Sequence, residues 1–256
     1  QNSESKLLSF VIPSFKDSRI IETIESIHAT GLDRGDYEII VKDGGSDENL
    51  LTAVRSVLGG SDKLDDSPDA GIFDGINQGL RLATGFYILT LGSDDRVLDL
   101  PIERLRDCRT KSVDIVMCSI QYTDHNWTPK RLWKARKLSF SAYLLGRQYA
   151  HFGFVCKKSV YEDIGYFNTD NPVNADYEFF YDLTSKIRKY QQLVLPNIVV
   201  QMKMGGNSSA SLKAVIKANF RIFKYLIARN PFALAGLMIK PIYKFEEYAR
   251  VFFTRK

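Results

Sequence analysis

Apolar runs alternate with amphipathic stretches through the first ninety residues, and this pattern predicts alternating strands and helices. The apolar runs at 7–12, 37–41 and 86–91 are typical of buried strands. A helix is expected from Asp17 or Ser18, as its cap, to His28, and a second helix at 47–58. Strand, helix and strand in this order favour right-handed βαβ units. The sequence therefore predicts an α/β fold, with a mostly parallel sheet flanked by helices.

The rest of the chain predicts fewer regular repeats of that unit. A loop at 69–71 runs into a helix that ends near Ala83, with an apolar and a polar stripe. Strands are expected at 113–120, 130–133, 152–156 and 192–202, with a short helix through Ile164 and a longer one at 174–187. Gly205 and Gly206 predict a turn, and helical segments follow to the end of the chain, broken by Pro231 and Pro241.

Composition bounds the class of protein. The 256 residues, 45% of them hydrophobic, suit one large domain with a tail. Three scattered cysteines, Cys108, Cys118 and Cys156, predict reduced and mostly buried thiols in an intracellular compartment. The start of the chain is polar, unlike a signal peptide, and the longest late apolar run, 232–239, is too short to span a membrane. We therefore expect a cytoplasmic protein.

Charge is distributed unevenly along the chain. Residues 213–256 hold ten Lys or Arg and two acids, whereas the first 212 residues hold 25 basic and 28 acidic groups. Cations and aromatic side chains together suit an anionic membrane surface. The sequence predicts a catalytic domain at 1–211 and a helical, basic and aromatic extension at 212–256 that contacts the membrane or packs on the body. Basic residues confined in this way do not favour a nucleic-acid binder.

Ser93-Asp94-Asp95 follows the third apolar run directly. Ligands of open α/β sheets bind beyond the carboxyl ends of the strands. Two adjacent carboxylates repel each other there unless a cation neutralises them, and hard oxygen ligands suit Mg²⁺ or Mn²⁺, which in turn suit a diphosphate. The alternative is an acidic loop that caps the next helix.

Four motifs together resemble the inverting glycosyltransferases of family 2, which have the GT-A fold. They are 10–15 (FVIPSF), 37–46 (YEIIVKDGGS), Ser93-Asp94-Asp95 and 174–178 (NADYE). Residues 69–83 and 205–209 are similar to bacterial transferases of extracellular-polysaccharide assembly, of the colanic-acid type. The resemblance covers residues 6–210. Lys16 departs from it, where the family often has Asn, and so does Asp47, where the family's usual Thr is missing.

The resemblance implies a role for each matching residue. Asp43 would bind the edge of the nucleobase, although an Asp before two glycines is also a common turn residue. Pro13, Ser14 and Phe15 would flank the base, the alternative for Phe15 being a place in the core. Asp95 would ligate the metal, and Asp94, with Ser93, would contact ribose or the metal shell.

The acceptor side carries further candidates. Asp176 would be the general base, the alternative being a helix-capping acid; Glu178 is the next candidate but lies about 200° around the helix. His151 would add a metal ligand or bind the diphosphate, unless it is structural. Asp69 and Asn77, with Asp74 and Arg81, would line the donor-sugar pocket or form a solvated face. Arg131, Lys134, Arg136 and Lys137, beside Trp133, would bind acceptor phosphates or be plain surface.

These interpretations predict a metal-dependent, inverting hexosyl- or N-acetylhexosaminyl-transferase that is peripheral on the cytoplasmic face of a bacterial membrane. Its donor would be a nucleotide sugar, with a UDP-sugar favoured and a GDP-sugar as the alternative, and its acceptor a polyprenyl-diphosphate-linked glycan. Two alternatives are a sugar-nucleotide pyrophosphorylase, which would need a Gly-rich loop where Pro13 to Asp17 stand, and an inactive scaffold of the same fold.

Overall fold

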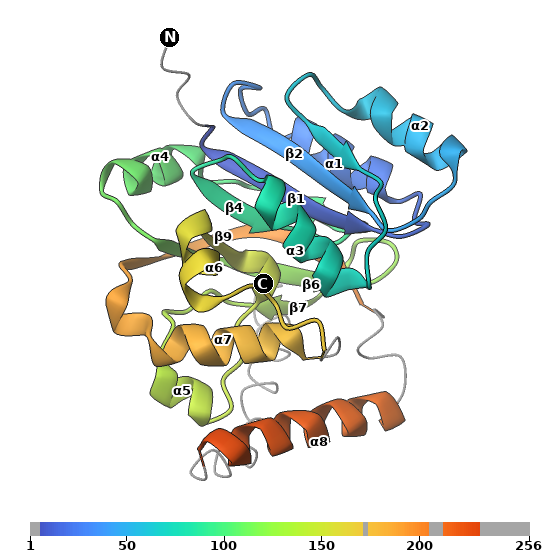
Figure 1. Cartoon of the computed structure of the whole chain (residues 1–256). Helices are drawn as coiled ribbons and strands as arrows, with labels where there is room; N and C mark the ends of the chain where they lie inside the picture. The colour runs from blue at the N-terminus through green and yellow to red at the C-terminus, as the bar shows by residue number, and fades with distance from the viewer. Residues whose placement is uncertain (1–5, 171–173, 205–211, 231–256) are drawn as a thin grey trace.

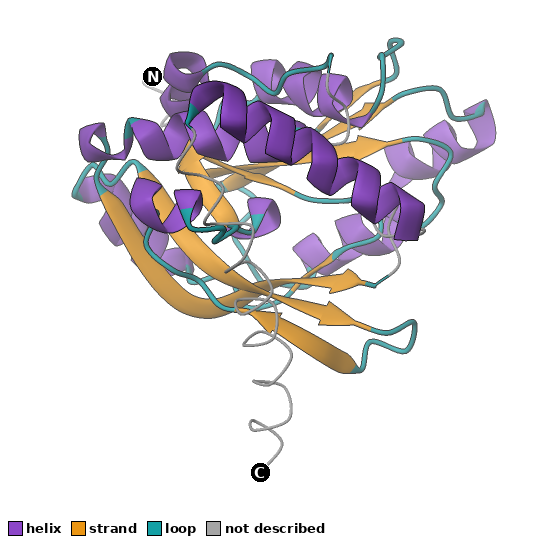
Figure 2. Ribbon diagram, turned by 90° about the horizontal axis from the view of Figure 1, so that it is seen from below, coloured by secondary structure: helices purple, strands orange, loops and turns teal. Residues whose placement is uncertain are grey.

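The structure is a computed structural model that describes residues 6–170, 174–204 and 212–230. In those residues one twisted and curved sheet runs through the molecule, with helices on both faces (Figures 1 and 2). Its strands lie in the order β3-β2-β1-β4-β8-β6-β9-β5, and β7 pairs with β6. The strands are β1 (Leu8–Ser14), β2 (Tyr37–Asp43), β3 (Lys63–Asp65), β4 (Tyr87–Thr90), β5 (Arg96–Val97), β6 (Ile115–Thr123), β7 (Pro129–Trp133), β8 (Phe154–Lys157) and β9 (Gln192–Lys203).

The first half of the sheet is parallel and the second half is mixed. β3, β2, β1 and β4 run in one direction. β8 lies antiparallel between β4 and β6, so β6 and its parallel neighbour β9 regain the direction of β4. The carboxyl ends of all these parallel strands therefore lie along one edge of the sheet. The α/β prediction with a mostly parallel sheet is confirmed.

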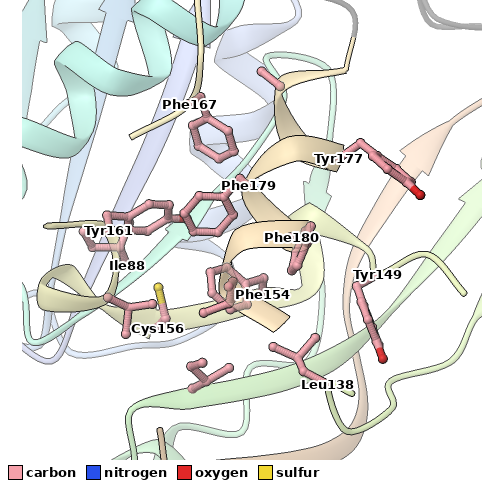
Figure 3. Close-up of a cluster of buried hydrophobic side chains, with 14 of the residues drawn as sticks. Ile88, Leu138, Tyr149, Phe154, Cys156, Tyr161, Phe167, Tyr177, Phe179 and Phe180 are labelled. Atoms are coloured by element: carbon pink, nitrogen blue, oxygen red, sulfur yellow. The ribbon is translucent and has the colours of Figure 1, made fainter. Parts of the chain in front are cut away.

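Alternating side chains divide the core into two apolar clusters, one on each face of the sheet. In β1, for example, Val11 belongs to one cluster and Phe10 and Ile12 to the other. The first cluster contains most of the buried aromatic rings, and Figure 3 shows Phe154 of β8 among Tyr161, Phe179 and Phe180. The second cluster lies under α1, α2 and α4. Burial on both faces explains why the central strands are continuous apolar runs.

The helices are α1 (Ile20–His28), α2 (Glu48–Val57), α3 (Ile72–Leu82), α4 (Ile102–Thr110), α5 (Phe140–Leu144), α6 (Lys158–Ile164), α7 (Ala175–Ser185) and α8 (Leu212–Arg229), with 3-10 turns at His151–Gly153 and Ile187–Lys189. α2 begins as predicted, because the Asp47 carboxylate accepts a hydrogen bond from Leu50 N at 2.9 Å. The expected cap of α1 is wrong: Arg19 precedes the helix without a side-chain cap, because Asp17 bonds to Arg19 and Ser93 instead.

Short elements were harder to predict than long ones. The sequence pattern did not indicate β3, β5, α4 or α5, and the helix expected at 174–187 ends two residues earlier, at Ser185. The three cysteines are free and buried, as expected. Within the described ranges, no helix combines the length and the apolar character that crossing a membrane would need. The predicted features at 205–209 and 231–256 lie outside the described residues.

α8 packs on the body through a few apolar side chains. Ile222 and Leu226 are buried in the first apolar cluster, and the ring of Tyr225 lies edge-on to Tyr181 of α7 at 5.6 Å. Phe220 and Ile227 point outward, with 55% and 38% of their surface exposed. The helix therefore has one packed and one exposed apolar side.

Candidate functional site

The loops that follow β1, β2 and β4 form the candidate site. These strands are adjacent and parallel, and Ser14, the last residue of β1, lies opposite Asp43, the last residue of β2. In Figure 1 both strands end on the right, the side on which α7 also begins. The geometry brings the predicted nucleotide-binding loops to one edge, as expected for a ligand at the carboxyl ends of parallel strands.

Asp43 is buried, and both of its carboxylate oxygens accept hydrogen bonds from its own loop. Its Oδ1 accepts hydrogen bonds from the backbone N–H groups of Gly45, at 2.9 Å, and Ser46, at 2.6 Å, and its Oδ2 accepts one from the Ser46 hydroxyl at 2.7 Å. Burial raises the pKa of Asp43, but these hydrogen bonds outweigh it, so the pKa lies below its ordinary value. Asp43 is thus held as an anion at the entrance to the loop.

Phe15 is the exposed ring beside that loop. It is 64% exposed and lies close to Gly45, where an added Cβ would be 3.7 Å from the ring. Placement in the core, the alternative for this residue, is wrong. Pro13 and Ser14 are buried at the end of β1, and Ser14 O accepts a hydrogen bond from Gly44 N at 2.8 Å. An exposed aromatic face next to a buried carboxylate suits a planar base, and the binding role of these residues stays a prediction.

A fully buried lysine connects the same loop to Asp69. Lys42 Nζ donates to the Asp43 carbonyl oxygen at 2.8 Å and to that of Ser67, and lies 3.8 Å from Asp69 Oδ2. Asp69 lies against Gly44, where an added Cβ would be 2.7 Å from Oδ2. Glycine at 44 therefore permits this close approach, and a larger residue there would displace the Asp69 carboxylate. The structure places Asp69 against the loop after β2, whereas the sequence suggested only that Asp69 lines a sugar pocket or belongs to a solvated face.

Asp95 is buried and has few partners. Its Oδ2 accepts one hydrogen bond, from Gly92 N at 2.7 Å. Burial raises the pKa of Asp95 to about 7, and the charge of Asp94 adds to the rise, against the hydrogen bond from Gly92 and the charge of Arg19. A carboxylate in this environment is stabilised by a cation.

Asp94 and Ser93 belong to a network at the start of α1. Arg19 donates to Asp94 Oδ2 at 2.7 Å and to both carboxylate oxygens of Asp17 at 2.8 Å, and the Ser93 hydroxyl donates to Asp17 Oδ2 at 2.8 Å. The Thr23 hydroxyl also donates to the Ser93 and Asp95 carbonyl oxygens. The loop that carries both acids is therefore fixed to α1 at several points.

His151 is buried behind the acidic loop. Its Nε2 lies 3.2 Å from the Thr90 hydroxyl at the end of β4, and its ring meets that of Phe167 edge-on at 4.8 Å. Burial lowers the pKa of His151 to about 3, so the imidazole is neutral at pH 7. In the described part of the chain no three His, Cys, Asp or Glu side chains gather as a metal site. Metal ligation by His151 stays a prediction.

Asp94 and Asp95 nevertheless fit a divalent cation by the chemistry of their donor set. Mg²⁺ is usually bound through one or two carboxylates, with waters and substrate phosphates as its remaining ligands. The buried Asp95 carboxylate, with a raised pKa, beside the partly exposed Asp94 provides that kind of half-site.

Asn77 joins α3 to the segment before α7. Its side-chain amide donates to the Phe167 carbonyl oxygen at 2.8 Å, and its side-chain oxygen accepts from Phe167 N at 2.9 Å. Along the same helix Asp74 accepts hydrogen bonds from Ala70 N and the Gln78 amide, and Arg81 lies over the ring of Tyr166. This polar stripe has structural partners, and its contact with a donor sugar stays a prediction.

Asp176 lies in the first turn of α7. Its Oδ1 accepts a hydrogen bond from Tyr177 N at 2.8 Å, and its surface is only partly covered. The amino-terminal half of α7 adjoins His151 through Phe167, whose ring contacts both His151 and Phe179. Glu178 is held elsewhere, by a hydrogen bond from the Asn168 amide at 2.9 Å. Both acids lie in the first turn of α7, with Asp176 nearer its start and Glu178 buried.

The predicted basic cluster is divided by the structure. Arg131 of β7 packs over the rings of Tyr122 and Trp133, at 4.2 and 5.1 Å from their centroids, whereas Lys134 and Lys137 are exposed beyond the strand. Its role toward acceptor phosphates stays a prediction.

The sequence interpretation missed three residues of the site: Lys42, Asp17 and Arg19. A lysine inside an apolar, buried strand and directly before Asp43 was an available signal for the first. The second and third could not be found, because their partner, the loop at 93–95, lies about 75 residues further along the chain.

Comparison with known proteins finds a matching family, similar sequences and similar solved structures. The model of the family described as glycosyl transferase family 2 matches residues 9–166. Glycosyltransferases of PGL/p-HBAD biosynthesis from Mycobacterium bovis and Mycobacterium tuberculosis are 24% identical over 185 residues, or 68% of each chain.

Solved structures share the fold. TarS from S. aureus (residues 1–349), solved with UDP, superposes with a TM-score of 0.58 at 16% identity, over 83% of this chain and 63% of that one. The mannosyltransferase PcManGT from Pyrobaculum calidifontis, solved with GDP-Man and Mn²⁺, gives 0.61 at 18% identity, over 97% and 74%. The chain thus spans somewhat less than two thirds of the TarS fragment. The predicted GT-A fold is confirmed.

Proposed function

Because this chain belongs to glycosyl transferase family 2, we propose that it transfers a sugar, with inversion, from a nucleoside diphosphate sugar to a hydroxyl group of a lipid-linked glycan. The observation that carries the proposal is the pair of buried carboxylates, Asp43 and Asp95, at the ends of strands on either side of β1. The UDP and GDP-Man bound by TarS and PcManGT support a nucleotide-sugar donor. A UDP-sugar and a hexosyl or N-acetylhexosaminyl group are the specific forms proposed.

The donor is held from the two loops. Asp43 accepts a hydrogen bond from a ring N–H of the base, since a carboxylate has more acceptor positions than its three present donors fill. Phe15 stacks on the base face, and Pro13 and Ser14 close the other side. We also propose that Asp94 orients the ribose and that Asp69 and Asn77 line the sugar pocket, Asn77 by holding the segment at Phe167.

Asp95, with Asp94, would hold the divalent cation, Mn²⁺ or Mg²⁺, and His151 is a further candidate ligand. When bound, the cation neutralises charge that develops on the departing diphosphate. Asp176 accepts the proton of the acceptor hydroxyl as its oxygen attacks C1 from the face opposite the leaving group. The positive end of α7 favours the ionised form of this carboxylate.

The Asp176→Asn variant tests the role of the base. An amide cannot accept the proton at that oxygen, so transfer should fall by about 100-fold or more, while UDP binding stays within about twofold of the wild type. Glu162→Gln, at an exposed position of α6, is the matched control and should keep full activity. Unchanged turnover of Asp176→Asn would refute the assignment.

The two alternative functions have their own outcomes in the wild type. Release of nucleoside triphosphate that depends on pyrophosphate would favour the pyrophosphorylase. Nucleotide binding without any turnover would favour the inactive scaffold.

The lipid-linked acceptor implies a place at the membrane, with residues 1–211 as the catalytic domain and 212–256 as the membrane-associating extension. Exposed Phe220 and Ile227 on α8, with Lys224 over the Phe220 ring, support this. The double variant Phe220→Ser, Ile227→Ser should sediment less with vesicles that contain an anionic lipid. Equal sedimentation of variant and wild type would reject a membrane role for this face of α8.

A further inference from the structure

Trp127 has a backbone conformation that its side chain disfavours. Its φ is +60°, in the left-handed region, and its N–H donates to the Asp124 carbonyl oxygen at 3.0 Å to close the turn between β6 and β7. Hairpins of this kind normally place Gly or Asn at such a position, because a Cβ is strained there. The turn itself therefore does not favour a tryptophan at this position, and the contacts of the Trp127 side chain must account for it.

Two cations hold the indole from neighbouring strands. Arg96 Cζ lies 3.8 Å from the ring centroid, and Lys203 Nζ lies 4.4 Å from it. The strand register brings them there: Lys203, at the end of β9, pairs with Thr123 at the end of β6, and Arg96 of β5 pairs with Gln201 of β9. The hairpin thus lays Trp127 across the ends of two strands that are distant in sequence.

This arrangement concentrates positive charge. Both cations contact one ring, so they lie closer together than the Debye length of about 10 Å in 0.1 M salt and repel each other. Among the described residues, Arg96 has one carboxylate within ion-pair distance, the half-exposed Glu22 at 3.4 Å, and Lys203 has none. An anion with several oxygens would relieve the repulsion, since Arg binds phosphate as a fork and Lys as a point charge.

The cluster also lies beside the candidate active site. Arg96 follows Asp95 directly, and β6 and β9 end on the same edge of the sheet as β1, β2 and β4. It lies, however, beyond β4 and on the opposite side from the nucleotide loops of β1 and β2. The position suits the acceptor rather than the donor.

We propose that Arg96, Trp127 and Lys203 form a subsite for a phosphate group of the acceptor. The inference rests on the proposed sugar transfer and names the anionic part of the acceptor that the enzyme recognises. Trp127 aligns the two cations, and the strain of its backbone is retained for that purpose.

Tryptophan fluorescence tests the subsite directly, because the chain has only two tryptophans. In Trp133→Phe protein, Trp127 is the sole indole, and geranyl monophosphate, added in metal-free and nucleotide-free buffer, should change its emission saturably, whereas geraniol should not. Arg96→Gln and Lys203→Gln in the same background should each weaken this affinity about tenfold. Lys111→Gln, which removes an exposed charge after α4, should leave it within about twofold. No saturable change, or an equal response to geraniol, would overturn the proposal.

A Trp127→Gly variant separates binding from a structural role. Glycine relieves the left-handed strain, so the melting temperature should stay level or rise, while calorimetry should record at least a tenfold loss of geranyl monophosphate affinity. A lower melting temperature with unchanged affinity would show that Trp127 only secures the hairpin and would overturn the proposal. Mn²⁺-dependent UDP binding to the wild type is measured separately: its failure would count against the donor half of the proposed function, and the phosphate titration is independent of it.

Discussion

Two aspartates at the same edge of the sheet, Asp43 and Asp95, are each only 2% exposed, yet their pKa values are shifted in opposite directions. The loop after β2 surrounds Asp43 with three hydrogen-bond donors and lowers its pKa, whereas the loop after β4 gives Asp95 one donor, Gly92 N, among the described residues and a pKa raised to about 7. Asp95 lies deeper in the protein than Asp43, so the loss of hydration raises its pKa further, and its fewer donors and the charge of Asp94 add to the difference. The proposed function gives the first loop the nucleobase as its ligand and the second loop a divalent cation.

The largest effect on folding is expected at Asp95. Its pKa is raised in the folded protein, so its contribution to stability is full below the ordinary value of 3.8 and is lost as pH rises through about 7. In EDTA buffer, Asp95→Asn should therefore be more stable than the wild type by roughly 2–4 kcal/mol at pH 8, with the difference shrinking toward pH 4. Urea unfolding across this pH range measures it.

Asp94→Asn is the control for that comparison. Asp94 is one third exposed and paired with Arg19, so its replacement should change stability by at most about 1 kcal/mol at any of these pH values. Equal curves for both variants would contradict the difference between the two positions.

Asp43→Asn should destabilise the protein, the opposite of the effect expected for Asp95→Asn. The lowered pKa of Asp43 contributes stability above pH 3.8 that is lost as pH falls through the lower folded value. The amide also presents N–H groups to the donors of Gly45 and Ser46, so unfolding at pH 7 should cost roughly 1–3 kcal/mol less, and the deficit should narrow at low pH. Asp47→Asn, at the cap of α2, should be nearly neutral because Asn caps a helix as well as Asp does. A stabilised Asp43→Asn protein would overturn this account of the loop.

A smaller effect on stability is expected when Lys42 is replaced beside the loop after β2. Lys42→Met keeps the buried stem but leaves the Asp43 and Ser67 carbonyl oxygens and the Asp69 carboxylate without the ammonium. Stability should fall by about 1–2 kcal/mol, with faster amide exchange at residues 66–71. Lys111→Met, at an exposed position after α4, should change neither. Unchanged exchange in the loop would show that Lys42 does not hold it.

Long, periodic elements of the fold were predictable, and contacts between distant segments were not. The apolar runs of β1, β2 and β4 and the acids after them identified the edge of the sheet that carries the candidate site, because burial on both faces leaves a continuous apolar pattern. β5 is two residues long, and its register on β9 depends on pairing that periodicity does not encode. For the same reason the sequence identified Asp94 but not Arg19, and Trp133 but not the clustering of Trp127 with Arg96 and Lys203.

UDP binding with and without Mn²⁺ tests the central claim most directly, that the two loops bind one ligand in different ways. Calorimetry should show that Mn²⁺ raises UDP affinity by at least about tenfold in the wild type and in Asp43→Asn. Asp43→Asn should be weaker throughout, through loss of the base contact, and Asp95→Asn should lose the enhancement while keeping its metal-free affinity. A full Mn²⁺ enhancement in Asp95→Asn, or wild-type UDP affinity in Asp43→Asn, would contradict the account.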